Sequence, residues 1–204
     1  MSARSEILGL VDAALSRADR SPVHVPRSYR SRPSPLSREG LVDLFVERVE
    51  DYRATVTRGA GAGASGLIRS VLAAELPPES HVVLPPDLPW EVSGGVVDSG
   101  LYATELDHLP AVVTAATVAI AETGTIVLTH GPGEGRRAIT LVPDLHVCVV
   151  LADQVVPDVP DAVALLDPRR PQTWISGPSA TSDIELNRVE GVHGPRTLHV
   201  VLLT

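Results

Sequence analysis

Apolar residues recur at two spacings along this chain, and the changes between them mark out its secondary structure. Val11 and Leu15 continue a helical repeat of apolar residues that begins behind Ser2, a residue type that caps helices. The next stretch, SPVHVPRSYRSRPSPLSREG, contains four prolines, which disfavour regular structure and favour an extended arm. We therefore predict an N-terminal helix and Pro/Arg-rich arm over residues 1–36, followed by one folded domain over 37–204.

Helical and strand patterns alternate after the arm. A helix is expected to begin near Ser37, and a short strand follows at 54–56. After a glycine-rich turn, apolar residues at helical spacing predict a helix through 67–72, and HVVL at 81–84 predicts a second buried strand. The order strand, helix, strand is typical of parallel sheets, so we expect the two strands to pair in parallel.

The middle of the chain follows a different pattern. Residues 111–131, AVVTAATVAIAETGTIVLTHG, are β-rich on both sides of Glu122, Thr123 and Gly124, which predicts an antiparallel hairpin with a glycine-assisted turn. The later segments LHVCVVL, QTWI and RTLHVVLL are expected to be strands, with a short helix near Pro160. Together these elements predict an α/β fold with a mixed sheet.

Composition excludes several classes of protein. All 17 basic residues are arginine, which argues against lysine Schiff-base enzymes and Walker-type phosphate loops. The net charge of -8 and the 3% aromatic content argue against binding nucleic acid. With Cys148 as its single cysteine, the chain has no disulfide framework and no iron–sulfur cluster of its own, and its histidines lack metal-site spacing.

Neither a secretion leader nor a run of apolar residues long enough to span a bilayer is evident. We therefore expect a cytoplasmic protein without a membrane span. The motif GAGASG at 61–66 has the G-x-G-x-x-G spacing of a dinucleotide site, with Asp87 as a ribose partner. Because a flexible turn between strand and helix accounts for a loop of glycine and alanine without a ligand, we favour the turn.

Glu122 is the first candidate for chemistry. In AIAETGT it stands at a tight turn between two apolar strands, where Thr123 and Thr125 can hydrogen-bond it and Gly124 frees the backbone. Such a glutamate could be a base, a nucleophile or a ligand anchor. An exposed hairpin tip accounts for the same residues equally well, so the residues alone leave both interpretations open.

A second concentration of polar residues lies between Trp174 and the last strand. Ser182 and Glu185 form an S-x-x-E capping box, which predicts a short helix from Ser182. Capping leaves the neighbouring hydroxyls, carboxylates and arginines unexplained. A helix N-terminus fed by a Gly-Ser-Thr turn can bind an anion, and Arg188 or Arg196 can add a guanidinium fork. If WI ends a parallel strand, this turn lies at the carboxyl end of the sheet, where ligands gather.

With these motifs in view, the sequence resembles the LUD-domain family, and within it the lactate utilization protein C branch. The resemblance rests on AIAETGTIVL, on RRAITLVPDLHVCVV with Arg137, Pro143 and His146, and on ISGPSATSDIE followed by GVHGPR. These motifs are long, stand in the same order, and span residues 111–203.

The resemblance implies a three-layer α/β/α fold with a mixed, mostly parallel sheet, similar to that of the NagB, ribose-phosphate isomerase and CoA-transferase proteins. It further implies a part in oxidising L-lactate to pyruvate together with two iron–sulfur proteins. Because one cysteine cannot hold a cluster, this chain would be the cluster-free member of such an oxidoreductase complex, or a regulator or substrate-binding unit for it.

The family motifs place the candidate site on two turns, which we expect to converge on one pocket for a small carboxylate or phosphate-bearing ligand. Arg196 is expected to pair with the charge of the ligand, and Glu122 is the candidate for an acid, base or nucleophile. The remaining ligand-binding candidates are Thr123, Gly124, Thr125, Arg137, Ser176, Gly177, Ser179, Thr181, Asp183, Glu185, His193 and Gly194.

Two other classes of function remain open. The chain could be an independent enzyme of the CoA-transferase or phosphosugar type, with Glu122 as its nucleophile or base and the Ser179 turn holding phosphate. It could also be a small-anion-binding module, or a non-catalytic protein whose N-terminal helix and arm dock a partner.

Overall fold

The computed structural model describes the chain except for residues 1, 17, 20, 27–34, 182–188 and 191–192. The chain divides into two compact units, Met1–Arg30 and Ser31–Thr204. In the first unit, helix α1 (Ala3–Leu15) is capped by Ser2, whose Oγ accepts a hydrogen bond from the Ser5 amide at 3.3 Å. This confirms the N-terminal helix and its cap. The domain boundary after residue 36 stays a prediction.

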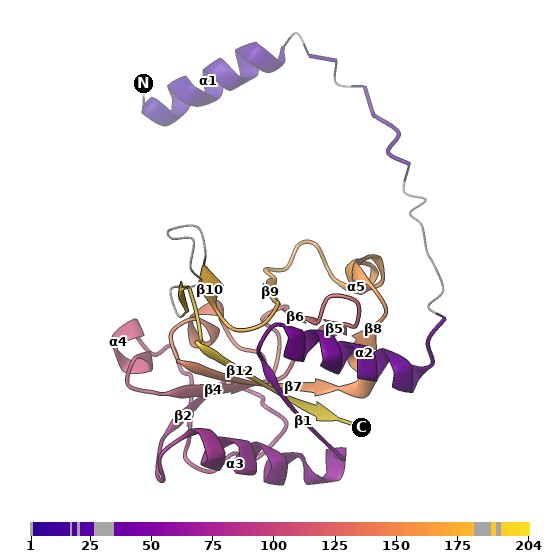
Figure 1. Cartoon of the computed structure of the whole chain (residues 1–204). Helices are drawn as coiled ribbons and strands as arrows, with labels where there is room; N and C mark the ends of the chain where they lie inside the picture. Colours follow the sequence, from indigo (N-terminus) through magenta and orange to yellow (C-terminus); the bar gives the residue numbers. More distant parts are fainter. Residues whose placement is uncertain (1, 17, 20, 27–34, 182–188, 191–192) are drawn as a thin grey trace. The chain divides into compact units, whose positions relative to one another are not determined.

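A six-stranded parallel sheet forms the centre of the second unit (Figure 1). Its spatial order is β1-β12-β7-β4-β2-β3, and every neighbouring pair is parallel. The strands are β1 (Thr55–Gly59), β2 (Val82–Leu84), β3 (Gly95–Val97), β4 (Ala111–Thr114), β7 (Leu145–Leu151) and β12 (Thr197–Leu203). The expected pairing of β1 with β2 is wrong, because β12, β7 and β4 lie between them.

A second, four-stranded sheet has the order β8-β5-β6-β9. Its members are β5 (Val118–Ile120), β6 (Thr125–Leu128), β8 (Val155–Val156) and β9 (Thr173–Ile175). Strands β5 and β6 pair antiparallel around the turn at Glu122, which confirms the predicted hairpin. Strand β9, which contains the WI dipeptide, runs antiparallel to β6. Because β5 also pairs with β8 in parallel, the small sheet is mixed, whereas every pairing in the large sheet is parallel.

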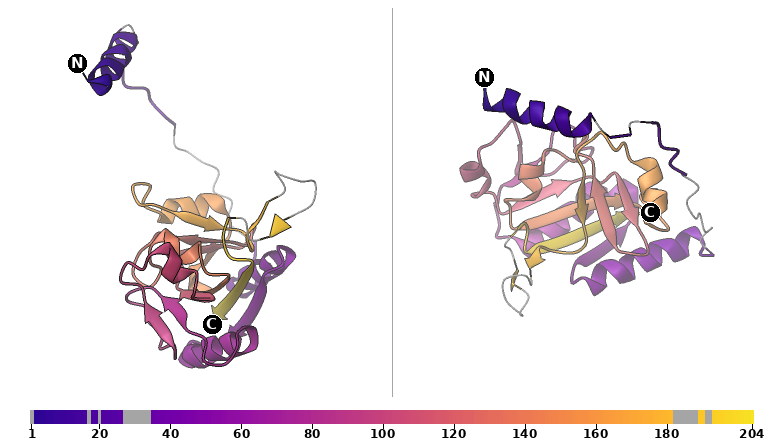
Figure 2. Two further views of the ribbon diagram at one scale, coloured as in Figure 1. Left: turned by 90° about the vertical axis from the view of Figure 1, so that its left-hand side faces the viewer. Right: turned by 90° about the horizontal axis from the view of Figure 1, so that it is seen from above.

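Helices cover the apolar faces of both sheets. Helix α3 (Ala64–Glu75) packs through Ile68 on one face of the large sheet. On the other face, helix α2 (Arg38–Asp51) and the small sheet enclose a core around Phe45. Helix α5 (Val159–Leu165) packs on the outer side of the small sheet through Ala162. In Figure 1 and the left view of Figure 2, α3 and α5 lie on opposite outer sides.

Alternation along β7 shows how the sequence builds these layers. Leu145, Val147 and Val149 belong to the core under α3, whereas Cys148 and Val150 belong to the core shared with α2 and the small sheet. The remaining short elements are α4 (Ala103–Leu106), β10 (Ala180–Thr181), β11 (Val189–Glu190) and the 3-10 turns η1 (Gly61–Gly63), η2 (Arg137–Thr140) and η3 (Ala152–Gln154).

The α/β class with helices on both sides of a mostly parallel central sheet is confirmed. The more specific similarity to NagB and CoA-transferase proteins stays a prediction. Among the residues that the structure describes, no helix is both long and apolar enough to cross a membrane.

Candidate functional site

A cavity of about 220 Å³ lies where η2 and the amino ends of β7 and β12 meet the turn after β9; we call it the Arg137 cavity. Six of the residues predicted from the sequence line it: Arg137, Ser176, Gly177, Ser179, His193 and Gly194. The turn was expected at the carboxyl end of a parallel strand. That expectation is wrong, because β9 is antiparallel to β6 and the cavity faces the amino ends of β7 and β12.

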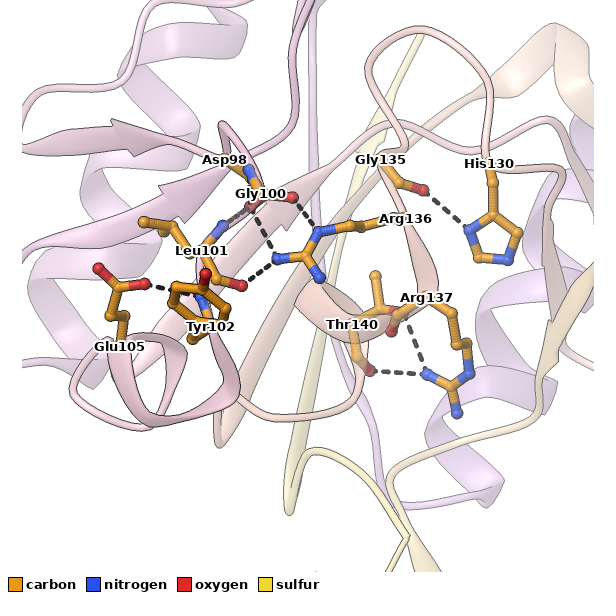
Figure 3. A network of polar contacts seen from close by, with 10 residues as sticks. All are labelled: Asp98, Gly100, Leu101, Tyr102, Glu105, His130, Gly135, Arg136, Arg137 and Thr140. Atoms are coloured by element: carbon orange, nitrogen blue, oxygen red, sulfur yellow. Dashed lines mark hydrogen bonds and ion pairs between the residues drawn. The ribbon is translucent and has the colours of Figure 1, made fainter.

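Two consecutive arginines at η2 have different partners (Figure 3). Arg136 donates to the buried carboxylate of Asp98, from Nε to Oδ2 at 2.6 Å and from Nη2 to Oδ1 at 2.9 Å. Arg137 donates from Nη1 to the carbonyl and hydroxyl oxygens of Thr140, both at 3.1 Å. Within the described part of the chain, Nε and Nη2 of Arg137 have no hydrogen-bond partner, so they can bind an anion in the cavity.

His146 forms the deepest polar part of the wall. It is only 2% exposed, and its Nε2 lies 2.8 Å from Thr114 Oγ1. Burial, together with the nearby charge of Arg137, lowers the pKa of His146 to about 4. The imidazole is therefore neutral at pH 7, and the cavity carries the positive charge of Arg137.

Ser179 holds the two loops of the cavity together. Its Oγ accepts a hydrogen bond from the amide of His193 at 3.1 Å, and its own amide donates to the Pro195 carbonyl at 2.8 Å. Gly177, with φ +78°, begins the turn against helix α2, where a Cβ would lie 2.7 Å from Tyr52 Cβ. Only glycine therefore allows this close approach.

A line of hydroxyls joins the hairpin turn to the cavity. Thr123 Oγ1 donates to Thr125 Oγ1 at 2.7 Å, and Thr125 Oγ1 lies 2.8 Å from Ser176 Oγ, which lines the cavity. Gly124, with φ +61°, packs against the backbone of α2, since a Cβ there would lie 2.7 Å from the Arg48 carbonyl carbon. Thr123, Gly124 and Thr125 thus support the wall from behind and do not line the cavity.

Glu122 lies at the exposed tip of the hairpin, where its amide donates to the Pro157 carbonyl at 3.1 Å. It is not among the residues that line the Arg137 cavity. Its role as acid, base or nucleophile stays a prediction, and in this arrangement its carboxylate does not contribute to the cavity wall.

Arg196 contacts a carboxylate of its own chain. Its Nε donates to Asp144 Oδ1 at 2.7 Å, and its Nη2 bonds to the other oxygen. Hydrogen bonding by Arg196 lowers the pKa of Asp144. Both residues line a separate cavity of about 480 Å³ beside Pro143. Ligand binding by Arg196 in the Arg137 cavity therefore has no support in this geometry.

Several predicted residues fall outside the described part of the chain. They are Asp183, Glu185 and Arg188, together with Ser182 of the predicted capping box, and the side chain of Thr181 is not described either. The described residues contain no group of three or more His, Cys, Asp or Glu side chains arranged to hold a metal ion.

Sequence reasoning missed part of the wall. Thr140, Thr173 and Trp174 line the cavity, and so does His146, which was noted only as a strand residue in a family pattern. The alternation of side chains along β7 would have identified His146 as a candidate. His146 is the one histidine on the face of β7 that it shares with Cys148 and Val150, and an unexplained polar side chain on such a face marks a site.

Comparisons with known proteins agree with the family resemblance found in the sequence. A model of the LUD domain matches residues 103–203, a range that contains every residue lining the cavity. Lactate utilization protein C of Deinococcus radiodurans is 45% identical over 180 residues, which are 84% of this chain and 83% of that protein. Lactate utilization protein C of a Geobacillus species is 31% identical over 45% of this chain, and the match spans only 41% of that relative.

The fold also matches a solved structure. The crystal structure of a DUF162 family protein from Deinococcus radiodurans superposes with a TM-score of 0.69 at 36% sequence identity. The match covers 83% of this chain and 100% of the other.

Proposed function

The chain belongs to the LUD-domain family, and from this membership we propose that it takes part in lactate utilization. In this proposal it is a component of a cytoplasmic complex that oxidises L-lactate to pyruvate. Its single cysteine supports a division of labour, since iron–sulfur clusters need several thiolates and would be held by partner proteins.

The Arg137 cavity is proposed as the place where a small carboxylate binds. The observation that carries this proposal is the Arg137 guanidinium, which has two nitrogens without a protein partner in the described chain and borders a cavity of about 220 Å³. The hydroxyl of Ser176 lines the same cavity and can donate to or accept from the ligand.

The first test is replacement of Arg137. The variants are produced in a lactate-utilising host whose own copy has been deleted. Extracts with R137Q are expected to show lactate-dependent dye reduction at least about tenfold below that of the wild type, because a charge-assisted hydrogen bond is lost. R169Q is the matched control, since Arg169 pairs with Asp167 and its side chain is 88% exposed. Wild-type activity of R137Q would contradict the proposed carboxylate site.

The same assay tests Glu122. If Glu122 acts in catalysis, E122Q abolishes lactate oxidation and leaves the unfolding midpoint unchanged, because the exposed side chain supports no buried contact. Unchanged oxidation by E122Q removes the catalytic role and leaves the cavity proposal intact.

An independent enzyme of CoA-transferase or phosphosugar type is the second candidate. One observation favours it: an arginine and a serine-bearing turn on one cavity suit a phosphate as well as a carboxylate. Native purification of the tagged protein from lactate-grown cells separates the two. Co-purifying iron–sulfur absorbance with lactate activity supports the complex, whereas a lone, colourless protein that turns over phosphosugars or CoA esters supports the independent enzyme.

A further inference from the structure

Three buried polar groups behind the Arg137 cavity form a directed row: Cys148, Thr114 and His146. Thr114 Oγ1 lies 2.8 Å from His146 Nε2 and 3.7 Å from Cys148 Sγ, and Cys148 Sγ lies 3.9 Å from the Ala115 carbonyl oxygen. All three side chains are at most 2% exposed. Water therefore does not compete for their hydrogen bonds.

The proton positions in this row follow from its end. A carbonyl oxygen only accepts, so the Cys148 thiol donates to Ala115, and burial keeps that thiol protonated by raising its pKa to about 12. The Thr114 hydroxyl then donates to Cys148 Sγ. With its single proton committed, Thr114 Oγ1 accepts from His146, which places the imidazole proton on Nε2.

The other ring nitrogen consequently holds a lone pair. A neutral imidazole has one proton, so Nδ1 of His146 is an acceptor. Across the described residues, the one side-chain nitrogen or oxygen that is sealed from solvent without a partner belongs to His199. Nδ1 of His146 has no partner among the described residues and is not sealed from solvent, and the space that His146 borders is the Arg137 cavity.

We infer that His146 Nδ1 accepts a hydrogen bond from a hydroxyl group of the ligand and thereby selects 2-hydroxy acids. In this arrangement the carboxylate of the ligand binds Arg137 and the neighbouring hydroxyl donates to His146. The ketone oxygen of a 2-oxo acid only accepts hydrogen bonds, so its lone pair would face the lone pair of His146 Nδ1. The cavity is therefore expected to bind the 2-hydroxy acid more tightly than the 2-oxo acid. This inference rests on the proposed carboxylate site and specifies its substrate class.

The test is a comparison of three probes on the purified full-length chain by titration calorimetry. L-lactate, pyruvate and propionate share a carboxylate and differ at the second carbon, where they have a hydroxyl, a ketone or no oxygen. We expect L-lactate to bind about tenfold more tightly than either of the others, the effect of about one hydrogen bond.

Thr114 supplies a matched pair of variants that spares the cavity wall. T114S keeps the hydroxyl that receives the Nε2 proton and is expected to keep the preference for L-lactate. T114V removes that acceptor, so the proton is free to move to Nδ1 and the preference is expected to fall to about twofold or less. Nitrogen NMR of the imidazole reads the tautomer directly in all three proteins, including any that binds poorly.

Separate outcomes overturn the separate claims. Equal affinity for the three probes, with binding still lost in R137Q, overturns the role of His146 and leaves the carboxylate site standing. A wild-type spectrum with the proton on Nδ1 also overturns it. If none of the three carboxylates binds at millimolar concentration, the proposed carboxylate site fails, and the selection by His146 fails with it.

Discussion

His146 is a buried histidine that the fold keeps neutral. Burial and Arg137 hold its pKa near 4, whereas a histidine in the unfolded chain titrates near 6.5. Above pH 6.5 neither state is charged, so this residue makes no contribution to pH dependence. As the pH falls from 6.5 toward 4, this histidine is protonated in the unfolded chain but stays neutral in the folded chain. The free energy of unfolding therefore decreases.

We therefore expect urea unfolding to show a larger loss of stability from pH 7 to pH 4.5 in the wild type than in H146Q. The difference should be on the order of 2 kcal/mol, at about 1.4 kcal/mol per pKa unit. His199, whose pKa is lowered mainly by its burial, acts in the same direction but is present in both proteins. If the free energy of unfolding of the wild type and of H146Q falls in parallel over this pH range, then His146 takes up its proton in the folded state as readily as in the unfolded chain.

At the scale of single residues, the sequence predicted which turns form the site more accurately than it predicted which side chains line the Arg137 cavity. Arg137, Ser176 and Ser179 lie in motifs long enough to be recognised, and all three line the cavity. Arg196 lies in an equally clear motif but pairs with Asp144, a residue from the loop before another strand. Which arginine stays available depends on contacts between distant residues, and local patterns contain no information about them.

At the scale of elements, helix α2 is the support on which both turns rest. Gly124 packs against its last turn at Arg48, and Gly177 packs against Tyr52 at its end. The hairpin of the small sheet and the turn after β9 are thus positioned by one helix. Contact between turn backbone and helix backbone leaves no space for a side chain.

The glycine at 177 provides a test of this support. G177A is expected to lower the free energy of unfolding by about 2–3 kcal/mol, because it combines a positive φ with a Cβ 2.7 Å from Tyr52 Cβ. G66A is the matched control: Gly66 lies in α3, nothing is within 4 Å of its Cβ position, and alanine should be neutral or stabilising by up to about 1 kcal/mol. Equal stability of G177A and wild type would contradict the close packing.

Local elements were predictable because their signals are local. Ser37 caps α2 by accepting from the Gly40 amide at 3.1 Å, and the turn between β5 and β6 contains its own glycine. Strand neighbours were less predictable. The strand, helix, strand pattern gives the direction of β1 and β2 correctly, but nothing within it indicates that three later strands separate them.

At the scale of the whole molecule, the two units differ in how they are stabilised. The second unit has cores on both faces of its large sheet. In the first unit, α1 has no buried residue, and its Ile7, Leu10 and Val11 are exposed. Because the second unit has cores of its own, we predict that it keeps its stability without the first unit.

Deletion of residues 2–35 tests this independence. Because Ser37 and α2 remain, the shortened protein is expected to melt within about 2 °C of the full chain, a change below about 1 kcal/mol. If α1 docks an iron–sulfur partner, the same deletion abolishes co-purification while L-lactate binding persists. A fall of about 5 °C or more would show that the first unit stabilises the body.

The place of β12 between β1 and β7 has a consequence for how the chain folds. β12 is the strand to which β1 is hydrogen-bonded, and the two are separated by well over half the sequence. Helices α2 and α3, which flank β1, can form early from local contacts, but β1 joins the sheet only when β12 arrives. Such distant pairing costs loop entropy before any contact compensates for it. Insertion of β12 should therefore be the slow, late event that commits the chain to its native state.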